Sequence, residues 1–337
     1  MNSVLVIRFG ALGDLCLVGW TLTRLVTAAE RTAGRITLVT KARFAALARE
    51  FRGIDRVIPL AEPGRAVDLW RLARELRTDP DDLVIDAHRV LRSRLLAGLL
   101  GRSPHVRLRK DTTARLRLLR TGEADPRLSR HLRDRLDALL DDVGLTTGEA
   151  TPPLAHLAPE LGRPAVLGLA PGAQWDPKRW PVVHWVALLE RGLASGVRIR
   201  LFVGPREEAW FEGSDLARAT AGVSEVETVR GASLTEVARE LAACRTVVCN
   251  DSGLLHLAEA TGTPVLAFFG PTVRAFGYTP QLEQSRLLER HDLDCRPCSR
   301  NGKRPCHRGD LACLVRIEPD TAWQALRAMP AWQEELA

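Results

Sequence analysis

The amino-acid sequence predicts an α/β protein of two Rossmann-like domains, each with a parallel sheet covered by helices. Short apolar segments of strand length alternate with amphipathic segments of helix length along almost the whole chain, and strands separated by helices pair in parallel. The alternation stops once, in a stretch rich in proline and glycine between residues 144 and 164, and then restarts. The 337 residues are too many for one small core, so two domains of about 150 residues each are expected.

The first half of the chain contains segments for five strands and four helices. The expected strands are 4–8, 36–40, 56–59, 83–86 and 106–108. The expected helices are 15–30, 42–49, 67–77 and 92–100. We place the first domain at residues 1–150 and the linker at residues 151–164, where prolines replace the periodic apolar pattern.

The second half repeats the pattern and adds a closing helix. The expected strands are 166–170, 198–203, 225–229, 246–249 and 263–269, and the expected helices are 182–194, 207–219, 234–242, 254–260 and 319–328. The second domain is placed at residues 165–318, followed by the C-terminal helical segment 319–337. Ligands of parallel sheets bind at the carboxyl ends of the strands. The polar loops that follow strands are therefore the candidate sites, and they are 10–14, 171–180 and 250–253.

The most informative of these loops runs from Asn250 through Asp251, Ser252 and Gly253 into a helix that carries His256. Free backbone N–H groups and the positive end of the helix dipole make such a turn a binding place for phosphate. The alternative is an ordinary N-cap, which requires only one Asp or Ser. Four polar or glycine residues in a row favour the ligand site.

The ordered set of motifs resembles glycosyltransferase family 9, the bacterial heptosyltransferases that move heptose from ADP-heptose to the inner core of lipopolysaccharide. Besides the loop at 250–258, the resemblance rests on four segments. They are the strand and loop 4–14, the segment 171–181 with its Lys-Arg-Trp-Pro sequence, the segment 131–145, and the late cysteines. The resemblance implies the GT-B fold, in which two parallel sheets face a central cleft.

A glycosyl transfer needs a base for the acceptor hydroxyl, and the resemblance assigns that role to Asp14. Asp14 follows a turn set by Gly10 and Gly13, just before the expected helix. The sequence by itself favours an N-cap role for this residue.

The donor site is expected in the second domain. Fixed cations and oriented N–H groups best stabilise the departing diphosphate, which indicates Lys178, Arg179 and the backbone of Ser252 and Gly253. The resemblance implies that Lys178 contacts the diphosphate and that Asp251 and His256 line the donor site. Glu207, at another strand end, is expected to bind the ribose hydroxyls. The alternatives are a solvated cation pair for Lys178 and Arg179 and a structural role for His256.

The acceptor side is less clearly marked. Arg92 and Ser93 follow a strand of the first domain and are expected to contact a phosphate or carboxylate of the acceptor. Between Arg89 and Arg135 there are fourteen Lys and Arg against four Asp and Glu. Such a stripe attracts polyanions, although it is equally typical of a solvated face. It has no interleaved aromatic residues on which bases could stack, so an anionic acceptor at the inner membrane surface is expected rather than nucleic acid.

Seven cysteines do not form the framework of a secreted protein. Cys16, Cys244 and Cys249 are expected to be buried thiols. The last four have the spacing C-x2-C-x7-C-x6-C and resemble a structural zinc or iron site; they are Cys295, Cys298, Cys306 and Cys313. The alternative is four reduced thiols in a loop.

We therefore expect an inverting, metal-independent heptosyltransferase that uses ADP-heptose and a Kdo- or heptose-bearing acceptor. No apolar run approaches the roughly 20 residues that span a bilayer, so a cytoplasmic protein with peripheral contact to the inner membrane is expected. There are three alternative hypotheses. The first is a glycosyltransferase of the same fold that uses another nucleotide sugar or acceptor. The second, more distant hypothesis is a nucleic-acid-binding module. The third, an NAD-dependent oxidoreductase, is disfavoured because the loop 10–14 lacks the G-x-G-x-x-G spacing.

Overall fold

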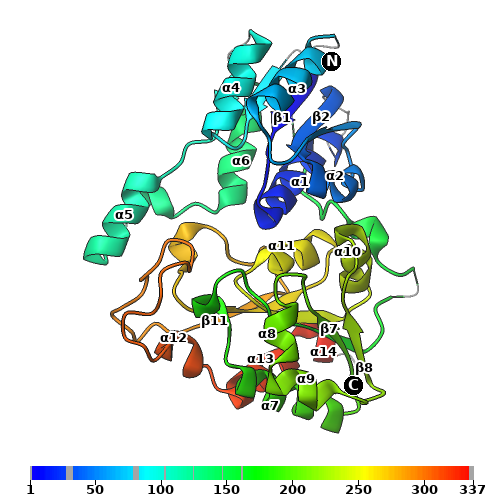
Figure 1. Ribbon diagram of the computed structural model, residues 1–337, viewed down its shortest axis with the longest axis vertical. Coiled ribbons are helices and arrows are strands. Elements are labelled where there is room, and N and C mark those ends of the chain that lie inside the picture. Colours follow the sequence, from blue (N-terminus) through cyan, green and yellow to red (C-terminus); the bar gives the residue numbers. More distant parts are fainter. Residues whose placement is uncertain are drawn as a thin grey trace. The chain divides into compact units, whose positions relative to one another are not determined.

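The computed structural model describes residues 2–27, 33–78, 83–101, 104–123, 125–145, 147–160 and 162–333. The chain divides into two units, the first from residues 1–111 and 130–155 and the second from residues 112–129 and 156–337. Each unit contains a parallel sheet, which confirms the predicted fold class (Figure 1).

The sheet of the first unit has five strands in the order β3-β2-β1-β4-β5. All pairs between these strands are parallel. The strands are β1 (Asn2–Ile7), β2 (Ala33–Lys41), β3 (Arg56–Leu60), β4 (Leu83–Asp86) and β5 (Val106–Arg107). The strand order reverses direction between β1 and β4, which is the point where doubly wound sheets bind ligands.

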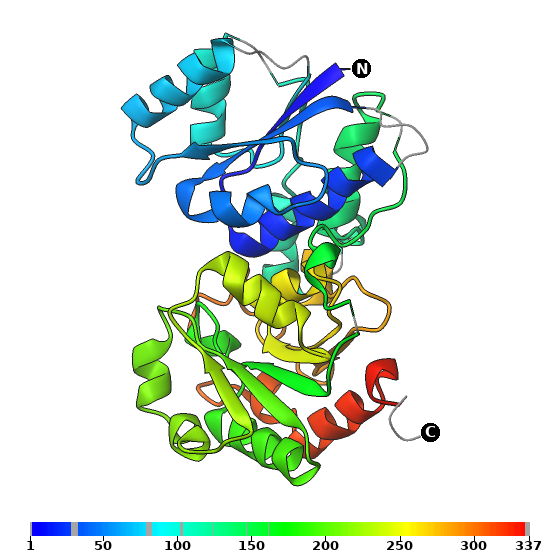
Figure 2. The ribbon, with the colours of Figure 1, turned by 90° about the vertical axis from the view of Figure 1, so that its right-hand side faces the viewer.

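The helices of the first unit cover both faces of this sheet (Figure 2). Because crossovers are right-handed, α1 (Leu12–Thr27) and α2 (Ala42–Arg49) lie on one face and α3 (Ala66–Thr78) and α4 (Leu91–Leu100) on the other. Helix α6 (Leu132–Asp141) packs beside α1. The apolar core of this unit lies between the sheet and helices α3 and α4. It consists mainly of leucine, isoleucine and valine side chains.

The sheet of the second unit has six parallel strands in the order β11-β10-β9-β6-β7-β8. They are β6 (Val166–Ala170), β7 (Arg198–Phe202), β8 (Val226–Val229), β9 (Thr246–Asn250), β10 (Val265–Phe269) and β11 (Arg286–Glu289). β6, β9 and β10 are buried along their whole length. The three central strands are therefore covered on both faces, as parallel strands require.

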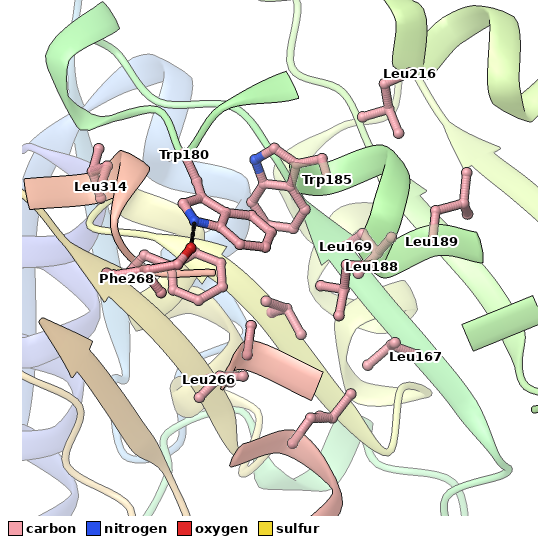
Figure 3. Close-up of a cluster of buried hydrophobic side chains, with 14 of the residues drawn as sticks. Leu167, Leu169, Trp180, Trp185, Leu188, Leu189, Leu216, Leu266, Phe268 and Leu314 are labelled. Carbon is pink, nitrogen blue, oxygen red and sulfur yellow. Dashed lines mark hydrogen bonds between the residues drawn. The ribbon is translucent and has the colours of Figure 1, made fainter. Parts of the chain in front are cut away.

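The helices of the second unit are α7 (Val182–Ala194), α8 (Glu208–Glu212), α9 (Asp215–Thr220), α10 (Leu234–Ala242), α11 (Gly253–Ala260), α12 (Ala312–Val315), α13 (Pro319–Arg327) and α14 (Pro330–Gln333). The core on one face of the sheet centres on Trp180, Trp185 and Phe268 (Figure 3). The indole N–H of Trp180 donates to the carbonyl oxygen of Ile317 at 2.8 Å. A residue of the motif loop 171–180 is thus built into the core.

One segment of the chain leaves the first unit and returns to it. Helix α5 (Thr112–Thr121) and the short 3-10 helix Pro126–Leu128 belong to the second unit. Ala114, Leu118 and Leu128 are buried against Phe276. The predicted first domain, residues 1–150, does not anticipate this excursion, and the predicted linker 151–164 is divided between the units at residue 155.

Several expected helices differ from the structure by a residue or two at an end, and two of them differ by more. Helix α1 begins at Leu12 rather than Leu15, so Asp14 lies in its first turn. The expected end of that helix, Glu30, lies outside the described residues. The expected helix 207–219 is two helices, because Ser214 starts α9 by accepting a hydrogen bond from Ala217 N–H at 3.3 Å. Within the described ranges, no helix combines the length and the apolar character that a membrane span requires.

Candidate functional site

The carboxyl end of β1 brings Asp14 and Arg8 together in the first unit. Their side chains form an ion pair and are 18% and 5% exposed, respectively. The Arg8 guanidinium also donates to the carbonyl oxygen of Ala87 and, at 3.1 Å, to that of Gly10. Asp14 accepts a further hydrogen bond from Ala11 N–H at 3.3 Å. These contacts fix one carboxylate at the switch point of the first sheet; Arg8 was not predicted as part of the site.

Gly10 is required by the backbone of this turn. Its φ is +140°, a conformation that side chains with a Cβ rarely adopt. A Cβ placed on it would also lie 2.9 Å from the ring of Phe44. Gly13, the other predicted loop glycine, lies inside the first turn of α1.

The neighbouring strand β4 ends in a loop organised by Asp86. This buried carboxylate accepts hydrogen bonds from the N–H groups of His88 (3.0 Å) and Arg89 (2.7 Å) and from the hydroxyl of Ser93 (2.9 Å). Ser93 is fully buried, so its hydroxyl holds the loop in place. Arg92 is exposed beside it at the start of α4.

Two more titratable groups face this loop, and the sequence patterns did not identify them. Burial, and then the positive charge of Arg8, lower the pKa of His88 to about 4, so this imidazole is neutral at physiological pH. Its Nδ1 accepts a hydrogen bond from Phe9 N–H at 3.4 Å. Burial and Arg8 also lower the pKa of Lys110. The first-unit site is therefore a group of cations around the two carboxylates Asp14 and Asp86.

The second unit assembles its own polar group at the carboxyl ends of β9 and β10. Lys178 forms an ion pair with Asp251 at 2.6 Å and donates to its carbonyl oxygen at 3.2 Å. The hydroxyl of Thr272 donates to the same carboxylate at 2.6 Å. The side chains of Lys178 and Asp251 are 14% and 11% exposed. Two motifs that are 73 residues apart in the sequence thus share one nearly buried ion pair.

Glycine at position 302 lets the chain approach Lys178. A Cβ there would lie 2.5 Å from the Lys178 side chain, and the φ of Gly302 is +81°. Gly302 lies in the cysteine-rich segment, as does Arg296, whose guanidinium donates to the carbonyl oxygens of Gly270 (2.6 Å) and Thr272 (2.8 Å). The cysteine-rich segment therefore supports the Lys178 site from outside.

Asn250 and Trp180 join the loop 171–180 to the end of β9. The side-chain oxygen of Asn250 accepts from Trp180 N–H at 3.0 Å, and its amide donates to the carbonyl oxygen of Pro171 at 2.7 Å. Arg179 points elsewhere; it pairs with Asp176 at 2.8 Å and its guanidinium lies 4.7 Å from the ring centre of Trp210. Asn250 therefore ties the first and last residues of the loop 171–180 to the end of β9.

Helix α11 begins beside this pair, with Ser252 as its N-cap residue and Gly253 as its first residue. The hydroxyl of Ser252 is buried and, within the described ranges, has no hydrogen-bond partner. His256 is 5% exposed, and its ring centre lies 6.3 Å from that of Tyr278. The first turn of α11, whose N–H groups have no partner within the helix, thus begins just after Asp251, the ion-pair partner of Lys178.

Glu207 lies where β7 ends. Its carboxylate accepts from Gly204 N–H at 3.0 Å. A Cβ on Gly172 would lie within 2.1 Å of the Glu207 carboxylate, so this position admits only glycine without a shift. Glu207 thus lies directly against the loop that follows β6.

Arg115 of α5 contacts the segment of the second unit that also lies beside His256. Its guanidinium donates to the carbonyl oxygen of Phe276 at 2.9 Å and lies 5.5 Å from the ring centre of Tyr278. The basic stripe between Arg89 and Arg135 is therefore divided between the two units. Part of it is used structurally, since Arg135 forms an ion pair with Asp111 at 2.6 Å.

The four late cysteines are free thiols near one another. Burial raises the pKa of Cys298, and the neighbouring Cys295 and Cys306 raise it further. Nevertheless, the described residues contain no group of three or more His, Cys, Asp or Glu side chains arranged to hold a metal ion. In this structure the four thiols are therefore not assembled as metal ligands.

Two doubly wound parallel sheets with polar groups at their carboxyl ends are the arrangement of the GT-B fold class. Comparison with solved structures agrees on the fold. The glycosyl transferase of family 9 from Veillonella parvula matches with a TM-score of 0.77 at 20% identity, covering 99% of this chain and 98% of that one. The Escherichia coli heptosyltransferase WaaC with ADP matches with a TM-score of 0.71 at 21% identity, covering 96% and 99%.

Sequence comparison gives the family. A family model described as glycosyltransferase family 9 (heptosyltransferase) matches residues 69–305. The chain is also 29% identical, over 360 aligned positions, to lipopolysaccharide heptosyltransferase 1 of Pseudomonas aeruginosa, with 97% of each chain covered. The chain belongs to glycosyltransferase family 9, the heptosyltransferases, as the resemblance of its motifs implied.

Proposed function

We propose that this glycosyltransferase moves heptose from ADP-heptose to a Kdo or heptose residue of a lipopolysaccharide inner-core acceptor, with inversion at the anomeric carbon. The observation that carries the donor side is the nearly buried pair of Lys178 and Asp251 beside the first turn of α11. A fixed cation next to free N–H groups suits a diphosphate. The heptosyltransferase relatives and the ADP-bound relative of the same fold support this assignment.

In the proposed reaction Asp14 is the general base. Its carboxylate removes the proton of the acceptor hydroxyl while that oxygen attacks the anomeric carbon of the heptose. The bond from this carbon to the diphosphate oxygen breaks, and ADP leaves with the electron pair. A single displacement from the opposite face inverts the configuration. Arg8 holds the Asp14 carboxylate in one orientation, as a positioned base requires.

The departing ADP is proposed to be stabilised by the second unit. Lys178 and the N–H groups of Ser252 and Gly253 would meet the charge that develops on the diphosphate. The buried hydroxyl of Ser252 is a further donor that the protein itself does not engage within the described ranges. In this scheme charge stabilisation comes from the protein, and no metal ion is assigned a step.

The remaining donor residues have distinct proposed tasks. Asp251 accepts from sugar hydroxyls, since a carboxylate beside a diphosphate would be repulsive. His256 donates to a phosphate oxygen, Glu207 binds the ribose hydroxyls and Arg179 contributes positive charge. On the acceptor side, Arg92 contacts an anionic group, and Ser93 acts through Asp86 to position the loop.

Thermal unfolding with ADP, ADP-heptose, UDP, GDP and NAD tests the donor. A ligand that binds only the folded state raises its stability by an amount set by the affinity. Selective stabilisation by ADP and ADP-heptose is expected. A preference for UDP or GDP would mean that the same fold uses another nucleotide sugar. Product analysis with a Kdo-terminated acceptor then tests the acceptor, and a transferred hexose or an unreactive acceptor would overturn the heptose or lipopolysaccharide assignment.

We also propose that the chain acts in the cytoplasm, in peripheral contact with the inner membrane where a lipid-linked acceptor is exposed. The absence of nucleic acid among its partners stays a prediction. A nucleic-acid-binding protein would bind DNA or RNA in a salt-dependent manner, and such binding without nucleotide-sugar affinity would contradict the proposal.

The structural zinc or iron ion at Cys295, Cys298, Cys306 and Cys313 also stays a prediction. The thiols would have to rearrange to bind it, because they are not assembled as ligands. Metal analysis of the purified protein and alkylation of the native thiols test it together. About one zinc or iron ion per chain with four protected thiols would support the site; four reactive thiols and no metal would exclude it.

A further inference from the structure

An unusual surface lies on the first unit, on the outward side of helices α3 and α4. Large apolar side chains are exposed there, with exposed fractions of 46% for Val67, 49% for Trp70, 72% for Leu91 and 48% for Leu95. We call this surface, together with Arg71, Arg74 and Arg94, the α3–α4 face. Exposed apolar groups that gather on one surface mark a contact site more often than single ones do.

Helical spacing shows that these residues share one side of each helix. On α3, Val67, Trp70 and Arg74 follow the i, i+3, i+7 pattern of one helix stripe. The opposite stripe, Leu69, Leu72, Ala73 and Leu76, is buried in the core. On α4, Leu91 and Leu95 are one turn apart, whereas Ser93, Leu96 and Ala97 are buried. Both helices thus have a buried core side and a second, exposed side with its own apolar residues.

The two helices are neighbours at both ends. At their starts, a Cβ on Gly64 would lie 3.7 Å from the guanidinium of Arg92. At their ends, the Arg77 guanidinium donates to the carbonyl oxygen of Leu99. Figure 2 shows both helices on the same side of the sheet. Their exposed stripes therefore form one surface.

The charge of this surface is positive. Helices α3 and α4 carry five arginines and two acidic residues, Asp68 and Glu75. Both acids are engaged elsewhere, Asp68 with Arg65 N–H at 2.7 Å and Glu75 with Arg56 at 3.1 Å. Within the described ranges, no carboxylate forms an ion pair with Arg71, Arg74 or Arg94. Their charges are therefore directed to solvent.

Apolar and cationic groups are also in contact with each other on this face. The Arg74 guanidinium lies 4.9 Å from the ring centre of Trp70. An aromatic ring next to a guanidinium suits the boundary of a bilayer, where the indole enters the headgroup region and arginine meets lipid phosphates. Apolar burial and attraction to anionic lipid add together in such helices.

We infer that the α3–α4 face docks the protein on a bilayer surface rich in anionic lipid. This inference rests on the proposed function, because a lipid-linked acceptor would lie at such a surface. Vesicle binding can be measured without turnover, so the two proposals can be tested separately. The face overlaps the basic stripe of the sequence only in α4, because α3 lies outside that stripe and α5 belongs to the second unit.

The test uses the full chain and vesicles of phosphatidylcholine with phosphatidylglycerol at about three to one, compared with vesicles of phosphatidylcholine alone. One double variant, Trp70→Ser with Leu95→Ser, removes apolar side chains of the face. A second, Arg71→Glu with Arg74→Glu, reverses its positive charge. The matched control is Val183→Ser with Arg239→Glu, at an apolar residue 64% exposed and an exposed arginine of the second unit. Circular dichroism verifies that all variants are folded.

The wild-type chain and the control should sediment with the anionic vesicles, and more salt should release them. Each α3–α4 variant should bind at least about tenfold more weakly, while turnover of a short, soluble acceptor stays unchanged. Equal binding by variants and wild type would overturn the inference. So would the absence of vesicle binding, in which case the face would be assigned to a protein partner. Loss of turnover on ADP-heptose with vesicle binding intact would instead contradict the proposed function alone.

Discussion

At the scale of single residues, Asp14 is the carboxylate on which the proposed chemistry depends. Asp14→Asn keeps the shape of the side chain and its hydrogen bond to Arg8 but removes the ability to accept a proton. We expect turnover to fall by about 10²-fold or more, with unchanged stabilisation by ADP. Steady-state kinetics and thermal unfolding measure the two effects.

The control for this prediction is Asp215→Asn, an exposed carboxylate on α9 of the second unit, which should behave as wild type. Asp14 is not the base if Asp14→Asn retains turnover within about tenfold of wild type.

Lys178 should contribute to nucleotide affinity through its charge. Lys178→Met keeps the length of the side chain that packs against Gly302 and removes the ammonium group. Because charge-assisted hydrogen bonds contribute about 1.5–3 kcal/mol, ADP affinity should fall by roughly tenfold or more. Titration calorimetry measures it. The double variant Lys178→Met with Asp251→Asn separates this loss from the effect of leaving Asp251 unpaired; unchanged ADP affinity in both would exclude Lys178 from the site.

His88 should make stability depend on pH. Its folded pKa, about 4, is below the ordinary value of 6.5, so the unfolded chain binds the proton more readily between these values. The associated stability is present above about pH 6.5 and is lost as pH falls toward 4. Urea unfolding near pH 7 and near pH 5 should differ by about 2 kcal/mol from this residue. His88→Gln should remove that part of the difference, and an unchanged pH dependence in the variant would contradict this origin.

At the scale of elements, helix α5 is held to the second unit by few contacts. Leu118 is 6% exposed and packs on Phe276. Leu118→Ala should weaken this docking by about 2–4 kcal/mol, which hydrogen exchange of the amides of α5 would detect as faster exchange. Leu116→Ala, at a residue of the same helix that is 40% exposed, should leave exchange unchanged. Equal exchange in both variants would mean that α5 is not held by this cluster.

The same helix shows why parts of the fold could not be read from the sequence. The segments at 42–49, 166–170, 182–194 and 234–242 were predicted with the observed bounds, because each has a clear apolar periodicity. Helix α5 has only two buried residues, Ala114 and Leu118, and the helix also contains three arginines and three threonines. Its partner, Phe276, is more than 150 residues away in the sequence, so no local pattern could identify the contact.

The candidate site was predictable to a similar degree. Loops at strand ends identified Asp14, Lys178 and Asp251 individually. Their partners were not predictable from spacing alone. Thr272 reaches Asp251 because β9 and β10 are neighbours in the sheet, and Arg8 meets Asp14 because the chain turns at Gly10. The low pKa of His88 likewise arises from burial and from the charge of Arg8, which follows another strand, and sequence spacing does not encode this.

At the scale of the whole molecule, the two sheets have separate apolar cores, one around α3 and α4 and one around Trp180, Trp185 and Phe268. The proposed base belongs to the first unit and the proposed diphosphate site to the second. This division assigns acceptor activation and donor binding to different cores. A substitution in one core can therefore impair one substrate while the other still binds.

The excursion of α5 has a consequence for how such a protein can be cut or recombined. The chain passes from one unit to the other three times, after residues 111, 129 and 155. A single proteolytic cut at any of these places divides at least one unit between the two fragments, which are then held to each other only by noncovalent contacts within that unit. An exchange of acceptor units between relatives would likewise have to transfer two separate gene segments and leave the piece between them behind. A fragment that simply stops at residue 155 would carry Ala114, Leu118 and Leu128 without the surface that covers them.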